Sequence, residues 1–213
     1  MVATTVYLEV GSKRAFACAV DWPGWSRAGR SPEAALEALA DYAGRYAEVA
    51  RRANARFAKT AGDDLDVVER VKGNATTEFG APGVVADIDR GPLTRSQAAR
   101  WSRLLEASWS LLDDVVAGAP ASLRKGPRGG GRDRDKMYAH VLDAERAYGR
   151  KLGIAKPASF PSTEAFRREV LAIARRDADG SPLADNGWPP RYAVRRIAWH
   201  VLDHAWEMQD RSD

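Results

Sequence analysis

The spacing of apolar residues changes once along this chain, at Gly91-Pro92. Before that point apolar residues fall in short runs, several of which alternate with polar residues. After it they recur every three to four residues over long stretches. Alternation with a period of two is typical of half-buried strands, whereas the three-four spacing is typical of amphipathic helices. We therefore expect an α+β protein, in which a small α/β domain (1–92) precedes a four-helix bundle (93–213).

In the first part, alternation predicts strands over 2–10 and 14–20, joined by a turn at Gly11-Ser-Lys. Ser31-Pro32-Glu33 predicts the start of a helix, because it combines a hydroxyl cap, a proline at the first helical position and an acid near the positive end of the dipole. The apolar stripe that follows predicts one helix to about Lys59. Three shorter runs separated by Gly and Pro predict further strands, at 65–71, 76–79 and 84–88.

The second part contains four candidate helices. The first follows Thr94-Arg-Ser-Gln97, which has the spacing of a capping box, and ends at Gly118-Ala-Pro120. The second covers 135–148 and stops near Gly153, the third follows Ser162, and the fourth follows Pro189-Pro190. A bundle of this kind builds cofactor sites from inward-facing side chains of different helices.

All three histidines of the chain lie on or beside the apolar stripes of these helices. His200 and His204 are four residues apart, so their rings lie one turn apart on one helix face, while His140 lies on the second helix. Three neutral imidazoles could bind a divalent cation and leave at least one position open, which is the arrangement of a catalytic site. Zinc is the first choice, with nickel or another first-row dication as alternatives. The competing interpretation is three hydrogen-bonded core histidines.

Other polar residues close to the histidines could take part in chemistry or in binding. The candidate catalytic carboxylates are Glu207, Asp143 and Asp203, each three residues after a histidine. They could instead be solvated helix carboxylates paired with a nearby arginine. The candidate substrate-binding residues are Arg128, Arg132, Tyr138 and Trp199. Arg128 and Arg132 belong to a Gly-rich loop that could clamp an acidic substrate, but which could equally be a solvated loop. The two aromatic residues could line a pocket or belong to the core.

Composition narrows the class of protein and its partners. No apolar run is long enough to span a bilayer, and no secretion signal is evident at the N-terminus, so we expect no membrane partner. The single Cys18 excludes an intrachain disulfide and fits a reducing cytoplasm. The net charge of +4 is modest and residues 1–92 are close to neutral, which makes a nucleic-acid partner unlikely.

The positions of the histidines carry a family resemblance. Residues 93–213 resemble the DinB/YfiT-like superfamily of four-helix metalloenzymes, in which one His lies on the second helix and an H-x-x-x-H pair on the fourth. His140 and His200-Val-Leu-Asp-His204 match that pattern. The resemblance implies a divalent-metal site, with thiol-dependent S-transferases and isomerases among its relatives. It therefore also implies a low-molecular-weight thiol as a second cofactor, and because related bundles often dimerise we include a homodimer among the expected partners.

The first part resembles a HicB-type antitoxin domain, through Pro23-Gly24-Trp25, Gly29 and Ser31-Pro-Glu-Ala-Ala-Leu36. Two functions are then open. The leading one is a metal-dependent transferase, isomerase or hydrolase that acts on a small, acidic substrate. The alternative is a non-enzymatic binding or regulatory module, with a protein or nucleic acid as partner, in which the bundle is a scaffold.

Overall fold

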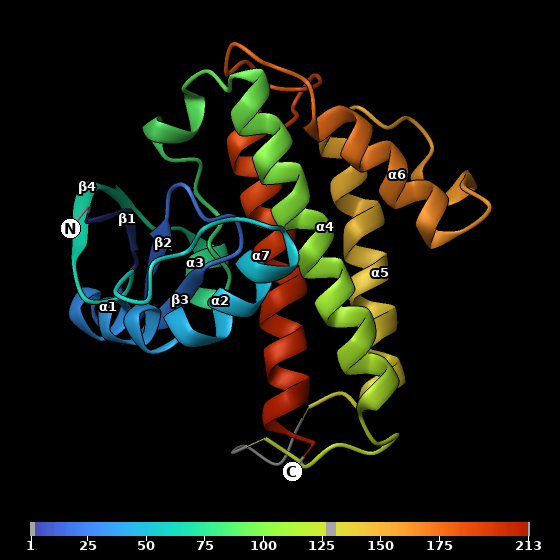
Figure 1. Cartoon of the computed structure of the whole chain (residues 1–213), viewed down its shortest axis with the longest axis horizontal. Helices are drawn as coiled ribbons and strands as arrows, with labels where there is room; N and C mark the ends of the chain where they lie inside the picture. The colour runs from blue at the N-terminus through green and yellow to red at the C-terminus, as the bar shows by residue number, and fades with distance from the viewer. Residues whose placement is uncertain (1–2, 127–130, 213) are drawn as a thin grey trace.

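The computed structural model describes residues 3–126 and 131–212. Over these ranges the chain forms a four-stranded mixed sheet and seven α-helices, so the protein belongs to the mixed α/β class. Figure 1 shows the sheet and its helices on one side of the molecule and the long helices on the other. The strands come from residues before Gly91, as the change in apolar spacing predicts.

The sheet has the order β3-β2-β1-β4. The predicted hairpin is confirmed, because β1 (Thr4–Val10) pairs antiparallel with β2 (Ala15–Ala19). The predicted strand at 65–71 is also confirmed as β4 (Leu65–Lys72), which pairs parallel with β1 at the edge of the sheet. The alternation did not predict β3 (Ser26–Gly29), a four-residue strand that continues the sheet beyond β2.

The prediction of a single helix to about Lys59 is wrong. The segment forms α1 (Pro32–Asp41), capped by the Ser31 side chain as expected, and then α2 (Ala43–Arg52), with the break at Tyr42. After Ala53 the chain turns through Asn54, whose φ of 49° is left-handed and therefore incompatible with a continuing helix.

Two of the predicted strands are also wrong. Residues 76–79 belong to a short helix, α3 (Ala75–Phe79), because the Asn74 side chain accepts hydrogen bonds from the amides of Thr76 and Thr77. This local cap outweighs the strand preference of the two threonines. Residues 84–88 run without strand pairing into a 3₁₀ turn, η1 (Asp87–Arg90).

All four helices predicted after Gly91 are confirmed. They are α4 (Arg95–Gly118), α5 (Arg134–Lys151), α6 (Thr163–Ala174) and α7 (Pro190–Asp210), with a short 3₁₀ turn, η2 (Pro157–Ser159), before α6. The side chains of Thr94 and Gln97 form the expected capping box of α4, and Ser162 caps α6. None of the helices in the described residues is long and apolar enough to cross a bilayer.

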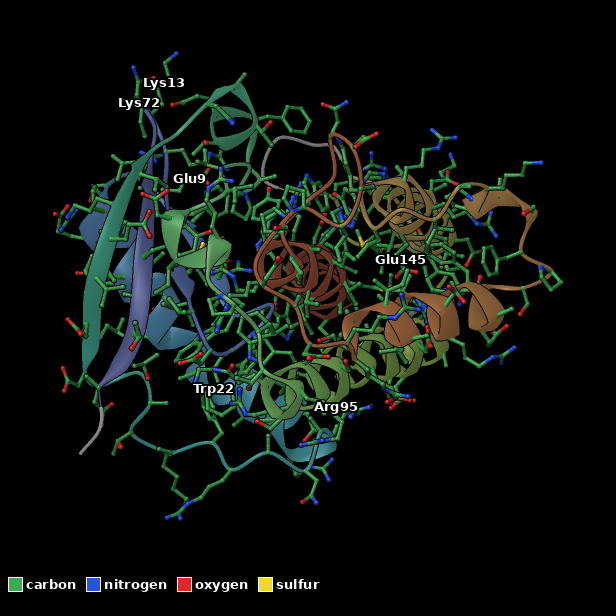
Figure 2. All side chains as sticks on the ribbon, turned by 90° about the horizontal axis from the view of Figure 1, so that it is seen from above. Glu9, Lys13, Trp22, Lys72, Arg95 and Glu145 are labelled. Carbon is green, nitrogen blue, oxygen red and sulfur yellow. The ribbon has the colours of Figure 1, made fainter. Side chains whose placement is uncertain are left out.

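The last helix, α7, lies at the centre of the molecule. Figure 2 looks almost along this helix, with the sheet on one side and α4, α5 and α6 on the other. Fifteen of its 21 residues are buried, as expected for a helix with neighbours on every side. Val194 and Ile197 join the core shared with α4, α5 and α6, whereas Leu202 and Trp206 join the core beneath the sheet. The position of α7 thus fixes which of its side chains face the bundle and which face the sheet.

Candidate metal centre

The three histidines meet along the contact between α5 and α7. The His140 ring packs against the His204 ring, and Tyr148, two turns further along α5, packs against His200. Later residues of α5 therefore meet earlier residues of α7, so the two helices run antiparallel along this contact. His140 comes to the pair on α7 only through this packing, because 60 residues separate it from His200.

The ligand nitrogens of His140, His200 and His204 lie within 4.8 Å of one another. Their ring centroids are 5.2 Å (His140–His200), 5.1 Å (His140–His204) and 4.7 Å (His200–His204) apart. A tetrahedral Zn²⁺ with Zn–N distances of about 2.0–2.1 Å places two ligand nitrogens about 3.3 Å apart. The rings must therefore close by up to about 1.5 Å, a movement that small side-chain rotations can supply. The three residues fit a single cation.

The surroundings of His200 and His140 favour the neutral form of the imidazole, which is the form that binds metals. His200 is 7% exposed, and its burial lowers its pKa to about 2, with the neighbouring His204 and Arg196 acting in the same direction. Burial also lowers the pKa of the half-buried His140, and the charge of Arg132 acts in the same direction. In addition, Nδ1 of His200 is buried without a hydrogen-bond partner among the described residues. A buried ring nitrogen without a hydrogen-bond partner lowers the stability of the fold, because its desolvation is not compensated. Its presence beside the other two histidines is what a binding site would show.

Glu207 holds the third histidine in place. Its Oε2 lies 3.2 Å from Nδ1 of His204, and its Oε1 accepts a hydrogen bond of 2.8 Å from Arg211. The hydrogen bond with His204 is the largest cause of a lowered pKa for Glu207, so the carboxylate is ionised at neutral pH. With the proton on Nδ1 directed at this carboxylate, Nε2 of His204 keeps its lone pair. Glu207 therefore orients the His204 ring.

The other two candidate carboxylates lie apart from the ligand nitrogens. Asp203 accepts a hydrogen bond of 2.9 Å from Arg27 of β3, and thus belongs to the contact between α7 and the sheet. Asp143 is exposed on α5, and its charge acts on His140 only as a minor influence. Of the three carboxylates, the structure brings only Glu207 into contact with a histidine.

The candidate substrate-binding residues are also divided. Arg132 is exposed, and its charge acts on both His140 and His200. Tyr138 donates a hydrogen bond to Asp113 on α4, and the buried Trp199 packs edge-on against Phe16 of the sheet. Arg128 lies outside the described residues.

The sequence pattern placed Tyr148 among the aromatic residues that flank the histidines, but it did not single out Arg196. Tyr148 packs against His200 with ring centroids 5.7 Å apart, and the guanidinium carbon of Arg196 lies 5.3 Å from the centre of the Tyr148 ring. Arg196 could have been found from helical spacing, because it precedes His200 by four residues.

A more open groove lies elsewhere, between α2, α4 and α7, with a volume of about 710 Å³. Its charged lining includes both signs, with Arg45 and Arg52 opposite Glu48 and Asp114, and no histidine lines it. We take the three histidines as the candidate site, because a site is sought among potentially reactive side chains and the charges that line this groove pair with one another.

No family model, curated protein or solved structure matches the chain. Function must therefore be argued from the site itself.

Proposed function

We propose that this protein is a metal-dependent enzyme in which His140, His200 and His204 bind one divalent cation. The observation that carries the proposal is the convergence of all three histidines of the chain, with ligand nitrogens within 4.8 Å of one another. Zn²⁺ is the first choice, because it favours three nitrogen ligands with a further position open; nickel or another first-row dication would suit imidazole as well.

The surroundings support a catalytic rather than a purely structural cation. Three protein ligands leave a position open for water or substrate, and His140 and His204 are only partly buried, so solvent reaches the centre. When bound, the cation would supply Lewis acidity and lower the pKa of a water or thiol ligand. Glu207 orients His204, and Arg132 contributes positive charge on the open side.

The reaction class that we propose is a transferase or isomerase reaction that depends on a low-molecular-weight thiol, or a hydrolysis, with a small acidic molecule as substrate. This rests on the DinB/YfiT-like pattern of His140 on the second helix of the bundle and the His200/His204 pair on the fourth. The four long helices α4 to α7 appear in the order that this resemblance requires. We propose a HicB-like character for the first part on the weaker basis of the residues around Ser31.

Metal content tests the proposal. The protein, purified without a metal-binding tag, is analysed by elemental mass spectrometry as wild type, as His204→Ala and as the control Gln209→Ala, an exposed position on the same helix. We expect about one metal ion per chain in the wild type and the control, and a loss in His204→Ala. A native protein that is metal-free and does not take up added Zn²⁺ or Ni²⁺ would refute the proposal and favour the scaffold alternative.

A further inference from the structure

Arg196 is a buried cation beside the candidate metal centre. It lies on α7 one turn before His200 and is only 9% exposed. Its guanidinium carbon is 4.7 Å from the centre of the Trp199 ring and 5.3 Å from that of Tyr148, which itself packs against His200. The side chain therefore lies against aromatic rings of both α5 and α7.

Within the described residues, this guanidinium has no ion-pair partner. Nη1 of Arg196 is buried and makes no hydrogen bond to any residue of 3–126 or 131–212. The neighbouring Arg195, by contrast, forms a buried ion pair with Asp89, and the buried Arg167 pairs with Glu145 and Asp113. Other buried arginines of this fold thus pair with carboxylates, whereas Arg196 pairs with none in the part of the chain that the structure describes.

Burial raises the pKa of Glu9 and the Arg196 charge opposes that rise, but this carboxylate cannot serve as the partner of Arg196. Its carboxylate already accepts hydrogen bonds from the Thr77 hydroxyl and from the amides of Gly83 and Val84. A buried guanidinium without an anion is unfavourable, and its contacts with aromatic faces do not replace the missing hydrogen bonds. A negatively charged group from outside the chain would therefore compensate the buried charge of Arg196.

We propose that Arg196 recognises an anionic group of the substrate, and that the substrate is a small molecule carrying this group a few bonds from its metal-binding atom. This inference rests on the proposed function. Residues four apart on a helix are separated by about 6 Å along its axis, so an anion paired with Arg196 lies about one turn from the cation held by His200. A planar guanidinium matches carboxylate and phosphate alike, because both accept two parallel hydrogen bonds.

The first test uses the Co²⁺-loaded protein and two thiols that differ only in charge, 3-mercaptopropionate and its neutral amide. Thiolate binding to Co²⁺ is followed by its charge-transfer absorption. We expect the wild type to bind the acid about 10- to 100-fold more tightly than the amide, because hydrogen bonds to charged groups are strong. Arg196→Met should remove the preference.

The control is Arg191→Met, the same substitution on the same helix. The Arg191 guanidinium already donates two hydrogen bonds to the Pro92 carbonyl, at 3.0 and 2.7 Å, so its removal should leave the preference intact. Equal binding of the two thiols by the wild type, or an unchanged preference in Arg196→Met, would overturn the assignment.

A second test separates this inference from the proposed function. The metal-free protein is heated with and without malonate or inorganic phosphate. A ligand of the folded state raises the melting temperature, so we expect an anion to stabilise the wild type and Arg191→Met but not Arg196→Met. A protein that binds no Co²⁺ but keeps this response would contradict the metal centre and retain the anion site. If neither anion raises the melting temperature of the wild type, or if Arg196→Met responds equally, the anion site is refuted whatever the metal result. The anion that raises the melting temperature more, malonate or phosphate, identifies the group as a carboxylate or a phosphate.

Discussion

Replacing His200 by Gln should make the metal-free protein less sensitive to acid. Burial lowers the pKa of His200 to about 2 in the folded chain, whereas an unfolded histidine titrates near its ordinary value of about 6.5. Between these values the unfolded chain binds one proton more than the folded chain. Stability therefore rises with pH through this window, and the contribution of His200 is complete above about pH 6.5 and lost as the pH falls.

The size of the effect follows from the same linkage. Between pH 7.5 and 5.0, a histidine that stays neutral in the folded state costs about 2 kcal/mol of unfolding free energy. The wild type should lose about 2 kcal/mol more than His200→Gln over this interval, because the other titrating groups are common to both proteins. The measurement is urea unfolding of chelator-treated protein at both pH values. It gives the loss of unfolding free energy on acidification for each protein, and the two losses are then compared.

His140→Gln is the matched comparison. Its pKa is also lowered by burial, but the ring is only half-buried, so the same substitution there should change the acid sensitivity in the same direction and by less. An equal acid response of wild type and His200→Gln would refute the reasoning, because it would mean that the His200 ring accepts a proton in the folded protein as readily as in the unfolded chain.

Three further substitutions test the packing on α7 and the ligand geometry. Asp89→Ala leaves Arg195 buried without its partner and should lower the unfolding free energy in urea by about 3–5 kcal/mol. The double variant Asp89→Leu/Arg195→Met should recover most of this loss, and an equal loss in the single and double variants would contradict the reasoning. Gly24→Ala should destabilise the protein by more than about 1 kcal/mol, because φ at this position is +93° and the added carbon would lie 2.6 Å from a side-chain carbon of Leu202. An unchanged melting temperature would contradict this close approach. Glu207→Gln should weaken Zn²⁺ binding about 10- to 100-fold in a competition titration, and unchanged affinity would mean that Glu207 does not orient His204.

Local patterns were sufficient where the information lies within a few residues. The four long helices, the Thr94 capping box, the Ser31 and Ser162 caps and the β1–β2 hairpin depend on spacing and side chain-to-backbone bonds between near neighbours. The same locality explains the errors. The Asn74 side chain caps a short helix, α3, where the residue types predicted a strand. At Tyr42 the predicted single helix divides into α1 and α2, although the apolar stripe continues across it.

For the candidate site, the sequence determined the pairing of His200 with His204, and the tertiary structure decided almost everything else. A spacing of four places His200 and His204 on one helix face whatever the fold, but only the antiparallel contact of α5 with α7 brings His140 to them. Because α7 is buried on nearly every side, its sequence could not tell the bundle-facing side chains from those that face the sheet. Hence Asp203 pairs with Arg27 and Trp199 packs on Phe16. Arg196, which has no ion-pair partner among the described residues, lies beside the histidines. The periodicity of a helix fixes which residues share a face, and only the packing of distant segments decides what that face meets.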